Sequence, residues 1–296
     1  MNMFKRRAFI KASLKYAVLP FCMEDIAFER LKRGKIKVAL QLVSIIPACK
    51  EDLVGTLHAI AEMGYKGVEL SSRFGGFYGK TPREFKKLLD EYDLACAGWH
   101  PALSEFEQST LQKTINTAHE LGVKYLIQAE LPVKKDEIDK RESWLKAADR
   151  FNQISEFCIS NALVAGYHNH TEEWSKMGDE TGWDILFDNT DKRFVHQIDT
   201  AHCLAGGGDP VKMINKYKGR TKTIHLKERG IKDFGPEEPP FGEGKCPWDD
   251  VFHACEKNGG TEWYIMERYM GQTAINNADM GGAKQYIQFM KSKKRA

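Results

Sequence analysis

Acids, histidines and a lysine stand at the ends of short apolar segments in the second half of the chain. One segment ends in Asp199 and is followed by His202, the next carries His225 and Lys227, and the last carries Glu267 near its end. Carboxylates and imidazoles are ligands that divalent ions bind in proteins. The residue types therefore predict a metal site, provided that the three segments run side by side.

A second group of polar residues could supply proton transfer. His168 and His170 flank Asn169, and alternate residues of an extended segment face the same side. A neutral imidazole or a carboxylate can remove a proton next to a carbonyl group. The residues expected to be catalytic are His168, His170 and Glu267, and those expected to bind substrate are His100, His202, Lys227 and Trp174.

Eight apolar segments recur along the chain and alternate with amphipathic ones. Their richness in Val, Ile, Leu and Tyr, without two-residue alternation, is typical of strands buried on both faces of a parallel sheet. Thr81, Pro82 and Glu84 form a helix-start signature, and Gly64, Gly122 and Gly259 stand where helices should end. The expected strands are 38–44, 67–72, 94–100, 124–130, 163–170, 194–199, 222–228 and 262–269.

This repeat predicts the α/β class and a single (β/α)8 TIM barrel, which needs about 250 residues and carries its active site at the carboxyl ends of its strands. We expect residues 35–296 to form that catalytic domain and residues 1–34 to precede it. Arg6 and Arg7 lie in a pattern similar to a twin-arginine export signal. If this signal works, the protein is expected in the periplasm. If it does not, the protein is expected in the cytoplasm. The apolar stretch after it is far shorter than the roughly 20 residues of a membrane span.

Composition narrows the class of partner. The formal net charge is +3, and no basic stripe with interleaved aromatic residues is present, so nucleic acid is not expected as a partner. The seven cysteines show no CxxC spacing and are odd in number, which argues against a zinc cluster and a disulfide framework. A small-molecule carbohydrate is the expected partner, and a homo-oligomer remains open.

Several motifs together resemble one family. They are ALQLVS, GYKGVELSS, YHNHTEEW, DTAH, IHLKE, FGEGKCPWDDVF and WYIMERY. Across about residues 36 to 290 the chain is similar to the sugar phosphate isomerase/epimerase family of the xylose isomerase-like TIM barrel superfamily. Members include tagatose and psicose epimerases, hydroxypyruvate isomerase, inosose dehydratase and dehydroshikimate dehydratase.

The resemblance implies one Mn, Mg, Co or Zn ion held by two glutamates, an aspartate and a histidine. The first ligand departs from the pattern, because the epimerases carry a glutamate where this chain has Gly166. A branch with an HNHxxEF-like motif implies Glu173 in its place, and Glu130 is the competitor. The last three ligands match Asp199, His225 and Glu267.

The activity implied by the resemblance begins with removal of a proton alpha to a carbonyl and a metal-stabilised enediolate. We expect an isomerase or epimerase acting on a sugar or keto-sugar. A lyase or dehydratase acting on an inosose or 3-keto-glycoside is the alternative, because the epimerases use the missing strand-five glutamate as a base. A non-catalytic sugar-binding barrel is a further alternative. A three-zinc DNA-repair endonuclease is not expected, since the ligands are too few and the charge is nearly balanced.

Overall fold

Eight parallel strands form one sheet that closes on itself. The computed structural model describes residues 36–230, 239–268 and 280–296. Neighbouring strands follow the order β8-β5-β4-β3-β2-β1-β10-β9. The two ends of this order meet where Asp199 pairs with His225, and the His225 amide donates to the Ile198 carbonyl at 2.9 Å. The strands are β1 (Lys37–Gln41), β2 (Gly67–Ser71), β3 (Ala95–His100), β4 (Tyr125–Gln128), β5 (Val164–His168), β8 (Val195–Gln197), β9 (Thr223–Leu226) and β10 (Trp263–Met266).

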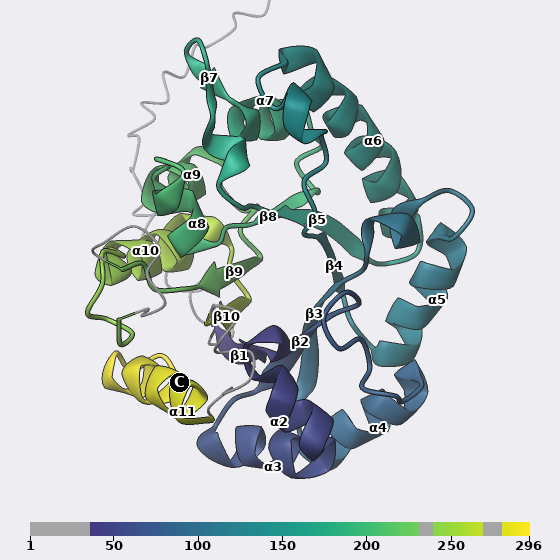
Figure 1. The fold of residues 1–296 in the computed structure, drawn as a ribbon, viewed down its shortest axis with the longest axis vertical. Helices are drawn as coiled ribbons and strands as arrows, with labels where there is room; N and C mark the ends of the chain where they lie inside the picture. The colour runs from purple at the N-terminus through teal and green to yellow at the C-terminus, as the bar shows by residue number, and fades with distance from the viewer. Residues whose placement is uncertain (1–35, 231–238, 269–279) are drawn as a thin grey trace, which may run out of the picture. The chain divides into compact units, whose positions relative to one another are not determined.

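Helices lie outside the ring of strands (Figure 1). This arrangement confirms the predicted (β/α)8 barrel, and each of the eight expected strands is present in a shorter form. A two-stranded antiparallel ribbon, β6 (Lys176–Met177) and β7 (Glu180–Thr181), follows β5. The described helices are α2 (Ile46–Glu51), α3 (Leu53–Met63), α4 (Pro82–Glu91), α5 (Leu111–Leu121), α6 (Arg141–Ser160), α7 (Gly182–Asp188), α8 (Thr200–Ala205), α9 (Pro210–Lys216), α10 (Trp248–Ala254) and α11 (Met280–Ser292).

Local sequence explains where several helices begin and end. Thr81 and Glu84 form a reciprocal capping box at the start of α4. Gly64 and Gly122 end α3 and α5 in the left-handed conformation, as predicted. After α10 that conformation falls on Gly260 (φ 65°), one residue later than expected, because a π-helical turn adds Gly259 to the helix.

Apolar packing divides into two layers. A large cluster lies between the strands and the helices. A smaller one fills the inside of the barrel, and its members are Ala39, Ala97, Tyr125, Ile127, Val195, Trp263 and Ile265. Toward the carboxyl ends of several strands, the next inward-facing positions hold buried polar side chains, among them Gln41, Glu69, Gln197 and His225. None of the described helices has the length and apolar character needed to cross a membrane. The twin-arginine pattern at Arg6 and Arg7 lies outside the described residues.

Candidate active site

Four side chains converge at the carboxyl ends of the strands. They come from the end of β5, from the residue that caps α8, from β9 and from the residue after β10. A ligand atom of each lies within 4.8 Å of the others, and the four are His168, Asp199, His225 and Glu267. Parallel strands carry these residues at the same end, so residues distant in sequence meet in one place.

The Asp199 carboxylate shows that this group suits a divalent ion. One oxygen, Oδ1, accepts from the His202 amide at 2.8 Å and caps α8. The other, Oδ2, is buried and has no hydrogen-bond partner among the described residues. The nearest cation, the Lys227 ammonium, lies 3.8 Å away. Because a buried, unpartnered carboxylate oxygen is costly, a cation coordinated by this oxygen would satisfy it. Two carboxylates and two imidazoles are a fitting donor set.

His225 lies between two carboxylates. Its Nδ1 is 2.7 Å from Glu267 Oε2, and its Nε2 is 2.5 Å from Glu69 Oε2. Burial lowers the pKa of His225, but the charges of Glu69 and Glu267 outweigh burial and raise the pKa to about 10. Burial likewise acts to raise the pKa of Glu267, yet Lys227 and His225 hold it well below its usual value. The two carboxylates thus favour the protonated form of the His225 imidazole that lies between them.

Glu69, on β2, is a site residue that the sequence analysis missed. It is fully buried, and its carboxylate contacts His100, His225 and two glutamine side chains. Burial acts to raise its pKa, but His100 and His225 outweigh this and leave the pKa well below its usual value. A Cβ at Gly98 would lie 2.3 Å from Glu69 Oε1, so the neighbouring strand needs glycine there. The available signal was an acid in the middle of the short, buried strand GVELS.

A lysine and two histidines lie beside the four converging residues. Lys227 donates to Glu267 Oε1 at 2.9 Å and lies 3.3 Å from His202 Nε2. The His170 and His202 rings are 5.2 Å apart. Burial, together with the charge of His202, lowers the pKa of His170 to about 4, so its imidazole is neutral at pH 7. Burial also lowers the pKa values of His168 and His202. His168, His170 and His202 therefore bring neutral imidazoles to a site that also holds the Lys227 ammonium group.

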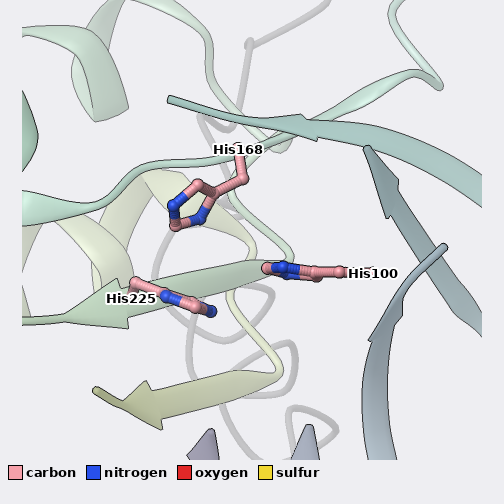
Figure 2. Close-up of side chains that lie close together, drawn as sticks. All are labelled: His100, His168 and His225. Carbon is pink, nitrogen blue, oxygen red and sulfur yellow. The ribbon is translucent and has the colours of Figure 1, made fainter. Parts of the chain in front are cut away.

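His100 joins the site from β3. Its ring stacks on that of His225, with centroids 5.4 Å apart, and lies 5.3 Å from that of His168. Figure 2 shows these three imidazoles gathered from β3, β5 and β9. They form a second group whose spacing could suit an ion. However, His100 Nε2 and His168 Nδ1 each lie 2.9 Å from Gln197 Oε1, and His225 Nε2 contacts Glu69. These three nitrogens therefore already have hydrogen-bond partners within the protein.

The structure does not bring the expected fourth ligand together with the other three. Glu173 lies in the short 3-10 helix η4 (Glu172–Trp174), where it accepts from the Tyr167 hydroxyl and from the His170 amide. Tyr167 and His168 are neighbours on β5 and point to opposite faces. Glu173 is thus held on the helix side of the strand. Glu130 also lies apart, bonded to the Leu103 amide and paired with Arg73.

Trp174, which we expected to bind substrate, lies in a packed layer of the protein, as does Trp99. Trp174 is 4% exposed, stacks on Trp183 with ring centroids 5.1 Å apart, and donates to the His170 carbonyl at 3.0 Å. Trp99 donates to the Ser72 hydroxyl and packs against Phe77. Trp174 therefore supports the segment that carries His170.

Comparison with known proteins agrees with this geometry. The model of the family described as xylose isomerase-like TIM barrel matches residues 57–293. The chain belongs to this family. A solved sugar phosphate isomerase/epimerase from Parabacteroides distasonis matches this xylose isomerase-like barrel with a TM-score of 0.71 and 22% identity, over 87% of this chain and 98% of that chain. A probable 3-DHS dehydratase from Bacillus anthracis matches with a TM-score of 0.64 and 14% identity, over 86% and 99%. At these identities the likeness shows the fold.

Sequence relatives of this xylose isomerase-like barrel point to one reaction class. An inosose dehydratase of Clostridium beijerinckii is 25% identical over 266 residues, which cover 77% of this chain and 87% of the relative. One from Geobacillus kaustophilus is 26% identical over 192 residues, or 58% and 60%. The relatives are enzymes, and they favour the lyase alternative over the isomerase or epimerase that we expected first.

Proposed function

We propose that this protein is a divalent-metal-dependent dehydratase that eliminates water from a cyclic polyhydroxy ketone of the inosose type. The observation that carries the proposal is the packing of Gly166 on β5. A Cβ there would lie 2.6 Å from Val195 Cγ2 and 2.7 Å from Ile127 Cδ1. The position at which the epimerases carry a glutamate base therefore has no room for a side chain. The inosose dehydratases among the sequence relatives support the same reaction class.

The ion would be held by Asp199, His225, Glu267 and His168, the four side chains that converge. When bound, a divalent ion supplies Lewis-acid polarisation of a substrate carbonyl. His168 replaces Glu173 as the fourth donor in this proposal, because His168 lies inside the barrel whereas Glu173 is held by Tyr167.

We assign the role of general base to His170. Its imidazole is neutral at pH 7, is only partly buried, and lies beside the converging group. It would accept the proton from the carbon next to the ketone. The electron pair of that C–H bond would form the carbon–carbon double bond as the C–O bond at the next carbon breaks.

We assign the role of the acid to Lys227. Its ammonium group lies 2.9 Å from Glu267 Oε1 and 3.3 Å from Nε2 of His202, whose ring is 5.2 Å from the ring of His170. It would donate a proton to the departing hydroxyl, which leaves as water. One base and one acid suffice for elimination, whereas epimerisation needs a base and an acid on opposite faces of one carbon.

The test is to incubate the Mn²⁺-loaded protein with an inosose in D2O and to follow the products by mass spectrometry and ultraviolet absorbance. We expect a conjugated product that has lost one water. In His170→Ala and Lys227→Met we expect turnover to fall by roughly 10²-fold or more. An isomer or epimer of the substrate, deuterated at the alpha carbon and formed without loss of water, would show the isomerase or epimerase reading to be right. Binding without conversion would identify a non-catalytic barrel.

A further inference from the structure

The carboxylate of Glu69 accepts hydrogen bonds from two glutamine side chains. Gln41 Nε2 donates to Oε2 at 2.8 Å, and Gln197 Nε2 donates to Oε1 at 2.8 Å. The side chain is fully buried, so no solvent competes for these contacts. An ionised carboxylate offers acceptor sites alone. Any ring nitrogen that faces Glu69 must therefore present an N–H group.

For His225 this requirement decides which nitrogen is available to an ion. Its Nε2, 2.5 Å from Glu69 Oε2, must carry a hydrogen. The lone pair of the imidazole is then on Nδ1 when the ring is neutral, and Nδ1 is the nitrogen that faces Glu267 Oε2 at 2.7 Å. A carboxylate that accepts from the outer N–H of a ligand histidine orients the ring and raises its basicity.

Glu69 also determines which nitrogen of His168 carries the hydrogen, although it acts through Gln197. The amide nitrogen of Gln197 lies 2.8 Å from Glu69 Oε1 and 3.0 Å from the Thr223 hydroxyl oxygen. Turning the amide over would set its carbonyl oxygen against the carboxylate, with no hydrogen between them. Gln197 Oε1 must therefore face His168 Nδ1, at 2.9 Å, and accept from it. The lone pair of His168 is then on Nε2.

We propose that Glu69 is a positioning residue that sets the tautomers of the histidines in the site, turning Nδ1 of His225 and Nε2 of His168 toward the ion. His100 must likewise carry a hydrogen on Nε2, because this atom lies 3.1 Å from Glu69 Oε2 and 2.9 Å from Gln197 Oε1. The inference rests on the metal site of the proposed function, but it does not depend on the reaction. The proposal also disfavours an ion among the three imidazoles of Figure 2. The nitrogens that face Glu69 and Gln197, which are His225 Nε2, His168 Nδ1 and His100 Nε2, carry hydrogens and donate them.

The first test needs no substitution. Ring nitrogens of ¹⁵N-histidine-labelled wild-type protein are observed by NMR, first after removal of metal at pH 8 and then with Zn²⁺ alone added. We expect His168 to carry its hydrogen on Nδ1 in the metal-free protein. With Zn²⁺ we expect His225 to keep its Nε2 hydrogen while Nδ1 shifts on coordination. A His168 hydrogen on Nε2, or Zn²⁺ on Nε2 of His225, would overturn the proposal.

The second test compares two variants of nearly unchanged shape. Glu69→Gln replaces the acceptor with an amide, so that Gln197 is free to turn over. We expect a mixture of His168 tautomers and Zn²⁺ affinity lowered by about 10- to 100-fold. Thr223→Val is the matched control, because it removes the neutral acceptor of the same Gln197 amide and leaves Glu69 in place. We expect it to keep the tautomer and to change the affinity by less than about threefold.

Equal losses of affinity in Glu69→Gln and Thr223→Val, or none in Glu69→Gln, would overturn the role of Glu69. Should Glu69→Gln fail to fold, the wild-type spectra decide by themselves. If the predicted tautomers are present but an inosose is not dehydrated, the proposed function fails while the role of Glu69 stands.

Discussion

Replacing Asp199 with asparagine separates the role of this residue in the fold from its proposed role as a ligand. Asp199 Oδ1 caps α8 through the His202 amide, whereas Oδ2 is buried without a hydrogen-bond partner among the described residues. Asparagine caps helices about as well as aspartate, so the free energy of unfolding of the metal-free protein should change by less than about 1 kcal/mol. The Oδ2 position, however, would then hold an amide group with no negative charge.

The loss of metal affinity can be bounded from the neighbouring contacts. Removing an outer partner of a ligand costs about 10- to 100-fold in affinity. Removing a charged ligand itself should cost at least as much as the upper figure, which corresponds to about 2.7 kcal/mol. Glu173→Gln should change the affinity by less than about threefold, because Glu173 is engaged by Tyr167 and the His170 amide. Glu130→Gln should behave in the same way, since Glu130 is bonded to the Leu103 amide.

The assay is calorimetric titration of chelator-treated protein with Mn²⁺, accompanied by thermal unfolding of each metal-free variant. The reasoning requires the affinity of Asp199→Asn to fall far below that of Glu173→Gln at similar stability. The opposite ranking would return Glu173 to the ligand set and refute the role of Asp199 as a ligand.

Three further outcomes are expected. Because the pKa of His225 is about 10, Mn²⁺ binding at pH 7.5 should release about one proton, which titrations in buffers of different ionisation enthalpy will measure; release of none would contradict a bond to its Nδ1. Burial raises the pKa of Glu173 from 4.5 to about 7, so the folded protein binds this proton more tightly than the unfolded chain. Stability relative to Glu173→Gln should therefore fall by up to about 3 kcal/mol as pH rises from about 4.5 to 7, and parallel pH profiles from denaturant unfolding would refute this. Gly166→Ala should lower the free energy of unfolding by about 1–3 kcal/mol, since its Cβ would lie 2.6 Å from Val195 Cγ2, and an unchanged denaturation midpoint would show that β5 has room.

Local patterns were enough to predict the elements of this protein. Apolar segments of strand length between amphipathic stretches predicted all eight barrel strands, and Thr81 with Glu84 predicted the start of α4. Parallel strands in a closed barrel place their carboxyl ends together, so the convergence of Asp199, His225 and Glu267 could be expected from order along the chain. In these cases, residues close in sequence determine the conformation, and one general rule of the fold supplies the rest.

Tertiary structure alone decided what each side chain faces. Glu69 lies 156 residues before His225, and no local pattern shows that the inward face of β2 reaches β9 across the barrel. Glu173 follows β5 closely in sequence, yet Tyr167 holds it on the outer face, and Trp174 is taken up by packing. Gly166 and Gly98 are glycine because side chains from neighbouring strands occupy the space of a Cβ. Sequence order fixes which strand ends meet, but the direction of a side chain and the space around it depend on strand twist, register and packing, which residues distant in sequence determine together.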